Sequence, residues 1–153
     1  MWPCDNNDGA LRFAQYLHRN GRDVLLVVDE DSRELKAFSE ASLSRHGLSI
    51  QQHVITVGTR ELEDCFSDAQ WATCANREWP RADGQQWVES DFASHRTEKF
   101  SSKTEKMIRE NSSVEVSGKP EILSKLAVGL SSADEVPEPL RALFAELIRR
   151  ADY

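Results

Sequence analysis

The sequence has few of the residues that build metal clusters. Its 153 residues include three cysteines and four histidines. No two cysteines stand in a Cys-x-x-Cys spacing, and no two histidines form a ligand pair at helical spacing. We therefore expect no zinc site in this chain.

Long apolar runs are also missing. No stretch approaches the roughly 20 apolar residues of a transmembrane helix, and the start, Met-Trp-Pro-Cys-Asp, lacks the basic and apolar parts of a signal peptide. With 29% charged and 39% hydrophobic residues, the composition is that of a globular domain. We expect a cytoplasmic protein that contacts no membrane and folds around one core.

Excess positive charge and a nucleotide-binding loop are absent as well. The formal net charge of −7 argues against wholesale binding to nucleic acid, although a local basic patch on an acidic domain can still contact phosphate. The segment Ser117-Gly118-Lys119-Pro120 lacks the glycine loop of a Walker A motif. We therefore expect no ATP hydrolysis by this chain.

What is present is an alternation of helical and extended periods over residues 1–70. The apolar spacing predicts helices at about 9–19 and 32–45, strands at about 24–28 and 53–57, and a helix that Thr59 caps. Each strand is followed by a helix-forming segment, which is the order that produces parallel strands. The sequence predicts an α/β fold of the Rossmann-like kind, a parallel sheet flanked by helices.

A tryptophan-rich segment, 71–101, follows this α/β part. Trp71, Trp79 and Trp87 surround a proline and an Asp-Gly turn, which is typical of a loop-rich insertion. Packing inside a small lobe is the ordinary role of such indoles. Stacking on nucleic-acid bases is the alternative.

Residues 102–153 are predicted to be a helical part of the same domain. Ser102 and Glu105 form a capping box, Pro120 suits the first turn of a second helix, and a last helix follows 137–139. Positive charge gathers across the first of these helix starts, at Arg96, Lys99, Lys103 and Lys106. These side chains form either a solvated face or a phosphate-binding surface.

Acidic residues follow both predicted strands. The stretch "VVDEDSR" places Asp29 and Asp31 behind the first strand, and Glu61 and Glu63 follow the second. Ligands bind outside the carboxyl ends of parallel strands, and carboxylate oxygens suit Mg²⁺ or Mn²⁺. Lys119, at a later helix start, could offset the charge of a phosphodiester. Helix capping is the other explanation of such acidic residues.

Several motifs, taken in order, resemble a known family. They are "VLLVVDEDSRELKAF", "HVITVGTRELEDCF", Trp-Pro-x-x-Asp-Gly-x-x-Trp, "KFSSK", "SGKPEILSKLA" and "EVPEPLRALFAELIRRAD". They are similar to the C-terminal TOPRIM region of the OLD (overcoming lysogenization defect) family nucleases, and the similarity covers nearly the whole chain. Asp29 and Asp31 match the family's Asp-x-Asp pair, Glu61-Leu62-Glu63 its acidic motif, and Lys119 its downstream lysine.

The resemblance implies a TOPRIM-like fold and a metal-dependent DNA endonuclease or nicking module. It implies Asp29, Asp31, Glu63 and Lys119 as catalytic residues, and Asp29, Asp31, Glu61 and Glu63 as ligands of Mg²⁺ or Mn²⁺. The implied partners are DNA and an ABC-type ATPase domain or subunit, in phage defence or DNA processing. The residues Arg96, Lys99, Lys103 and Lys106 would contact the DNA.

The chain departs from the family pattern in one respect. Family members place a strand ending in Glu-Gly, with a metal-binding glutamate, a few dozen residues before the Asp-x-Asp pair, and no such strand precedes Asp29 here. We therefore expect a fragment of a larger protein, a split-gene product completed by a partner, or a domain that has lost activity. The alternative to a nuclease is a TOPRIM-like interaction domain without catalysis.

Overall fold

The computed structural model describes residues 7–33, 35–96 and 99–151. The chain divides into two compact units. Unit 1 comprises residues 1–57 and 143–153, and unit 2 comprises residues 58–142. The two units are described separately below.

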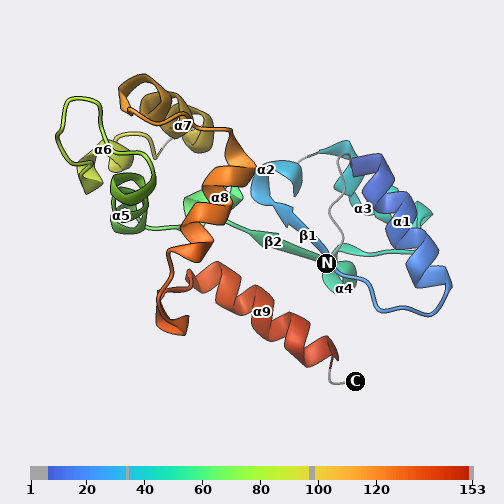
Figure 1. Cartoon of the computed structure of the whole chain (residues 1–153). Helices are drawn as coiled ribbons and strands as arrows, with labels where there is room; N and C mark the ends of the chain where they lie inside the picture. Colours follow the sequence, from blue (N-terminus) through green and yellow to red (C-terminus); the bar gives the residue numbers. More distant parts are fainter. Residues whose placement is uncertain (1–6, 34, 97–98, 152–153) are drawn as a thin grey trace. The chain divides into compact units, whose positions relative to one another are not determined.

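Two short parallel strands form the sheet of unit 1. β1 (Leu26–Asp29) pairs with β2 (Val54–Val57), and the register joins Asp29 to Val57. Most of these residues are β-branched or aliphatic, which favours extended backbone. The parallel pairing confirms the sequence prediction, although each strand begins one or two residues later than expected. The carboxyl ends of the two strands therefore lie side by side, and Figure 1 shows α2 directly after β1.

Helical segments surround this sheet along the sequence of unit 1. They are α1 (Asn7–Arg19), α2 (Glu30–Arg33), η1 (Lys36–Phe38), α3 (Glu40–Arg45), α4 (Ile50–His53) and the part of α9 (Glu138–Ala151) that follows residue 142. α1 confirms the helix predicted at about 9–19. Arg150, near the end of α9, donates to the carbonyl oxygen of Gln52 at 2.6 Å and ion-pairs with Asp23 at 3.1 Å.

The single helix predicted at 32–45 is wrong. Extended backbone at Leu35 (ψ 139°) and Ser39 (ψ 150°) separates α2, η1 and α3. The Ser39 hydroxyl accepts the Ser42 N–H at 3.3 Å and so begins α3 anew. A serine side chain can bind a backbone N–H in this way and end one helix before the next begins. The spacing of apolar residues continues across the break, so the spacing alone does not reveal it.

The core of unit 1 is mainly aliphatic, with Phe38 as its one aromatic residue among those described. Its buried residues come from α1, β1, η1, α3 and the segments between them: Leu11, Ala14, Val24, Val28, Phe38, Leu43 and Leu48. Val27, on the other face of β1 from Val28, is 37% exposed. Only one face of this strand therefore packs against the core of the unit.

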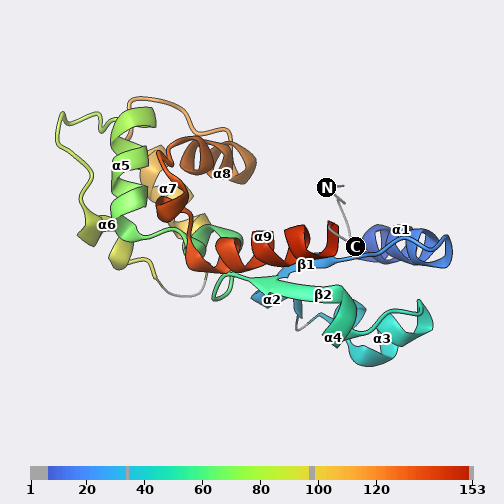
Figure 2. The ribbon, with the colours of Figure 1, turned by 90° about the horizontal axis from the view of Figure 1, so that it is seen from below.

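Unit 2 is helical within its described residues. Its elements are η2 (Leu62–Cys65), α5 (Asp68–Glu78), α6 (Glu89–Ala93), α7 (Phe100–Asn111), α8 (Lys119–Val128), η3 (Ala133–Glu135) and the first residues of α9. α5 packs against both α6 and α8, as Figure 2 shows. The helix predicted to begin at Thr59 is wrong, because η2 and extended backbone at Phe66 (ψ 139°) precede α5, which Ser67 caps.

Tryptophans form the centre of unit 2. Trp71, Trp79 and Trp87 are almost completely buried, and the Trp71 ring lies 5.7 Å from Phe92 and 5.4 Å from Phe100, centroid to centroid. Two of the indoles also donate hydrogen bonds to carbonyl oxygens, Trp71 to Glu63 at 3.2 Å and Trp87 to Trp79 at 2.7 Å. The packing interpretation is confirmed, and base stacking by these three rings is wrong.

The three helix starts predicted for residues 102–153 fare differently. α7 begins at Phe100, two residues before the predicted capping box, after Lys99 in the left-handed region (φ 61°). α8 begins as expected, with Pro120 in its first turn after Gly118. α9 begins at Glu138, inside the Pro137-Glu138-Pro139 entry that the last helix was predicted to follow. Over the ranges that the structure describes, none of these or the other helices combines the length and apolar character needed to cross a bilayer.

Candidate active site

The loop after β2 is closed around a carboxylate. The N–H groups of Thr59, Arg60 and Glu61 donate to the two oxygens of Asp64 at 2.7, 2.7 and 3.0 Å. Gly58 makes the turn at φ +81°, and a Cβ there would stand 2.2 Å from the Glu61 carbonyl oxygen. Successive N–H groups that converge on one anion form a nest. This nest fixes the backbone that carries Glu61.

Arg96 binds the segment that follows the nest, residues 64–68. Its guanidinium donates to Asp68 Oδ1 at 2.8 Å, to the Asp64 carbonyl oxygen at 2.8 Å and to the Phe66 carbonyl oxygen. It also lies over the Phe100 ring, 4.3 Å from the centroid. Arg96 was predicted to contact DNA, and the structure places its side chain in contacts within unit 2.

Three of the motifs that carry the family resemblance meet at the Glu61 carboxylate. Ser101, from "KFSSK", donates its backbone N–H to Oε2 at 2.9 Å and its hydroxyl to Oε1 at 2.7 Å. Lys119, from "SGKPEILSKLA", places Nζ 2.8 Å from Oε1. The side chain of Glu61 is 11% exposed and that of Lys119 is 43% exposed. We call Glu61, Ser101 and Lys119 the Glu61 cluster.

The pKa of Glu61 is lowered by this arrangement. Burial alone would raise the pKa, but the hydrogen bonds from Lys119 and Ser101 stabilise the charged form more strongly. The carboxylate also lies at the N-terminus of α7, where Ser101 is the second residue and N–H groups have no partner within the helix. Glu61 is therefore an ionised group that caps α7 from another segment.

Two backbone features place Lys119. It is the first residue of α8, between Gly118 (φ +114°) and Pro120. Proline fixes the backbone of the first turn and needs no N–H partner there. The lysine thus extends toward Glu61 from a rigid helix start, and its side chain is partly exposed to solvent.

The other predicted acidic residues lie elsewhere. Glu63 is buried, and its carbonyl oxygen accepts the Trp71 indole N–H. Asp29 ends β1 in unit 1, where Oδ1 accepts the Ser32 N–H at 3.2 Å. Asp31 is in α2, and its side chain is outside the description. The structure thus joins Glu61 to Lys119 and assigns Asp29 to the other unit.

A divalent cation fits these positions unequally. Glu61 already accepts three hydrogen bonds, one from a cation, and a metal ion at Oε1 would be repelled by Lys119 at close range. Asp29 and Asp31 offer hard oxygen donors of the kind that Mg²⁺ and Mn²⁺ prefer. Within the described part of the chain, no group of three or more His, Cys, Asp and Glu could hold a metal ion.

Lysines of the predicted DNA-binding set lie along α7 or at its start. Lys99 precedes the helix and is exposed, and Lys103 and Lys106 follow on exposed positions. Lys106 pairs with Glu110 at 3.7 Å, with both side chains largely in solvent. These lysines lie on the surface of unit 2.

Sequence reasoning missed two residues of α7. Ser101 supplies two of the three hydrogen bonds to Glu61, yet the capping-box signal pointed to its neighbour Ser102. Thr104, on the same buried face, has a hydroxyl without a hydrogen-bond partner in the residues described. The apolar residues Phe100 and Ile108 mark this buried face in the sequence, and the spacing of 101, 104 and 108 could have placed Ser101 on it.

Comparisons with known proteins add no relative. No protein-family model, no curated protein and no solved structure matches the chain.

Proposed function

We propose that this chain is a metal-dependent DNA endonuclease or nicking module of the OLD TOPRIM type, which works with an ABC-type ATPase domain or subunit. The observation that carries the proposal is the Glu61 cluster. Segments 40 and 58 residues apart in sequence, which the family resemblance had selected, converge on one buried carboxylate by hydrogen bonds of 2.7 to 2.9 Å.

Lys119 is the phosphate-binding residue in this proposal. Glu61 and Ser101 hold it in place, because a carboxylate fixed by three donors gives the ammonium a defined position. The Lys119 side chain is 43% exposed, whereas the Glu61 side chain is only 11% exposed. A phosphodiester could therefore approach the lysine from solvent without uncovering Glu61.

Asp29 and Asp31 would hold Mg²⁺ or Mn²⁺ at the carboxyl end of β1. The bound ion would supply positive charge to a phosphodiester. Asp29 contributes one oxygen to the Ser32 N–H and thereby caps α2, which fixes the carboxylate at the strand end. Lys99, Lys103 and Lys106 are proposed to contact the DNA backbone.

A non-catalytic interaction domain is the second candidate. The observation that favours it is the set of hydrogen bonds that the Glu61 carboxylate already accepts from Ser101 and Lys119. Because of these bonds, the carboxylate at position 61 of the family's acidic motif is not suited to bind a metal ion. In this case the Glu61 cluster would be a structural clasp between α7, α8 and the loop after β2.

Nicking of supercoiled plasmid distinguishes the two candidates. We expect the purified chain to nick plasmid weakly, with Mn²⁺ favoured over Mg²⁺, and we expect Lys119→Met and Asp29→Asn each to lower the rate by about tenfold or more. Lys125→Met is the matched control, because Lys125 is an ion-paired lysine of the same helix, 2.8 Å from Glu78.

The outcomes separate cleanly. Nicking that requires Lys119 and Asp29 but not Lys125 supports the nuclease. Equal nicking by all three variants would reject it in favour of the interaction domain. Circular dichroism of each variant shows whether the fold is retained.

A further inference from the structure

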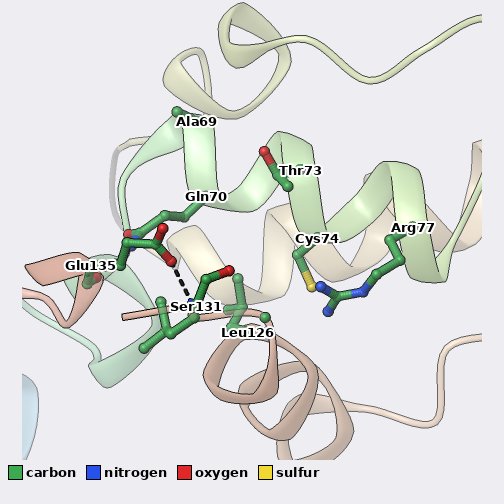
Figure 3. A pocket seen from close by; sticks show the side chains of 10 residues that line it. Ala69, Gln70, Thr73, Cys74, Arg77, Leu126, Ser131 and Glu135 are labelled. Atoms are coloured by element: carbon green, nitrogen blue, oxygen red, sulfur yellow. Dashed lines mark hydrogen bonds between the residues drawn. The ribbon is translucent and has the colours of Figure 1, made fainter. Parts of the chain in front are cut away.

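A cavity of about 270 Å³ lies in unit 2, apart from the residues of the Glu61 cluster. One wall is a face of α5, and the other is the end of α8 with the segment that leads to η3. Figure 3 shows Arg77 and Glu135 at opposite ends of it, with Cys74, Ser131 and Leu126 between them. A cationic group and an anionic group thus bound one small space.

The cationic end carries excess positive charge. Arg77 pairs with Glu78 at 2.6 Å, and Glu78 is shared with Lys125 at 2.8 Å, so one carboxylate serves two cations. Arg77 Nη2 donates to the Lys125 carbonyl oxygen at 3.0 Å, which fixes the guanidinium at the end of α8. Over the described ranges, no acceptor takes a hydrogen bond from Arg77 Nη1.

Gly129 leaves room for this guanidinium. Its backbone (φ −74°) is one that any residue adopts, so conformation does not require glycine there. A Cβ at position 129 would stand 3.0 Å from Arg77 Nη1 and 3.1 Å from Nη2. The missing side chain is therefore explained by the space that Arg77 occupies beside the cavity.

The anionic end is fixed by hydrogen bonds of its own. Glu135 Oε2 accepts the Ser131 N–H at 2.6 Å, and the Glu135 carbonyl oxygen accepts Gln70 Nε2 at 2.7 Å. The second carboxylate oxygen, Oε1, accepts no hydrogen bond from the described residues. This oxygen can receive a donor from a ligand.

The middle of the cavity is apolar and neutral. Leu126 and the Cys74 side chain are buried there. Burial raises the pKa of the Cys74 thiol to about 11, so the sulfur carries no charge at neutral pH.

We propose that this cavity binds a small zwitterion of the ω-amino acid type. Arg77 would bind its carboxylate, Glu135 its ammonium group, and the aliphatic chain would lie over Cys74 and Leu126. Opposite charges at the two ends of an apolar slot select a ligand that carries both charges at a matching separation. This site is independent of the proposed nuclease function.

The test uses probes of graded length on the full chain. We expect 4-aminobutyrate, 5-aminopentanoate or 6-aminohexanoate to bind with a clear preference for one length, followed by amide shifts in an NMR titration. The shifts should fall in residues 69–77 and 126–135. Pentanoate and pentylamine, each with one of the two charges, should bind at least about tenfold more weakly than the preferred zwitterion.

Substitutions at the two ends of the cavity test whether the probe binds there. Arg77→Met and Glu135→Gln should each weaken binding by about tenfold or more, whereas Arg109→Met, at an exposed pair with Glu105, should not. Gly129→Ala should weaken binding, because a Cβ 3.0 Å from Arg77 Nη1 displaces the guanidinium. Binding without a preferred length, binding insensitive to Arg77 and Glu135, or no binding at millimolar probe would overturn the proposal.

Discussion

The two units bury their side chains in different ways. Unit 2 has three buried tryptophans around Phe92 and Phe100, and two of the indoles also donate to backbone carbonyls. Unit 1 has aliphatic residues beside a two-stranded sheet, one face of which leaves Val27 37% exposed. Large aromatic side chains remove far more area from water than aliphatic ones. The difference indicates that most of the stabilising burial lies in unit 2.

The acidic residues of the two units also differ in burial and in the number of donors that they bind. Glu61 in unit 2 is buried and matched by a cation and two further donors. Asp29 in unit 1 is partly buried and accepts a single N–H among the residues described. The charge of a buried carboxylate must be balanced by donors or cations of the protein itself, whereas a partly exposed carboxylate can be solvated or can bind a ligand. We therefore expect Glu61 to stabilise the fold, and Asp29 stays a proposed metal ligand.

The largest expected effect comes from the aromatic core. Trp71→Ala should destabilise unit 2 by about 3–5 kcal/mol, the range for removing a large aromatic side chain from a packed core. Native-state hydrogen exchange should show lost protection in α5, with the amides of β1 changed much less. Equal loss of protection in α5 and β1 would show that the two units unfold as one, and would contradict the difference between their cores.

The nest after β2 should come next. Asp64→Asn replaces one acceptor oxygen by an NH₂ group, which donates and cannot accept, so we expect a loss of about 1–3 kcal/mol in the free energy of unfolding. Asp83→Asn is the control, because Asp83 pairs with Arg81 on the surface. Urea denaturation compares the two variants. A smaller loss for Asp64 than for Asp83 would contradict the role of the nest.

The pH dependence of Glu61 gives a third test. Its lowered pKa means that the folded state binds fewer protons than the unfolded state near the ordinary glutamate pKa of 4.5. The stability from Glu61 is therefore complete above pH 4.5 and is lost as the pH falls through the folded value. Glu61→Gln should be less stable than wild type at pH 7, and the difference should shrink below pH 4.5.

Thermal melts from pH 7 to pH 3 measure this difference. Glu105→Gln, which removes an exposed ion pair with Arg109, is the matched control and should show a smaller pH-dependent change. A difference between wild type and Glu61→Gln that stays constant over the whole pH range would mean that Glu61 is not ionised in the folded state.

The smallest expected effect is the response to metal. Millimolar Mn²⁺ or Mg²⁺ should raise the melting temperature of the wild type by preferential binding to the folded state. Asp29→Asn and Asp31→Asn should blunt this shift, and Glu61→Gln should leave most of it. A shift that survives Asp29→Asn and Asp31→Asn but is lost in Glu61→Gln would reverse the assignment of the acidic residues.

The sequence predicted the elements that depend on local patterns. α1, α8, α9 and the parallel pairing of β1 with β2 follow from apolar spacing, from Pro120 and from β-branched runs. The predictions at 32–45 and at Thr59 were wrong because single side chains, Ser39 and Asp64, hold backbone groups that a continuous helix would need. Such competition for hydrogen bonds leaves no trace in the spacing of apolar residues.

In the candidate site, too, local patterns could be predicted from the sequence and distant contacts could not. Lys119 at a helix start could be predicted, since Gly-Lys-Pro is a local signal. Its partner could not, because the bond from Lys119 to Glu61 spans 58 residues, and no local pattern specifies a contact at that separation. Ser101 was missed for the related reason that α7 is capped from a distant segment by the Glu61 carboxylate rather than by its own serine.

The nest at 59–61 has a chemical consequence. Asp64 acts there as a built-in counter-ion, and its carboxylate occupies the position that a free anion would take among three N–H groups at the end of a strand. Asp64→Gly would remove this anion and leave the N–H groups to the solvent. Sulfate or inorganic phosphate added to that variant should restore part of its lost melting temperature, whereas chloride at equal ionic strength should restore less. One substitution thus separates a purely structural turn from a receptor for oxyanions.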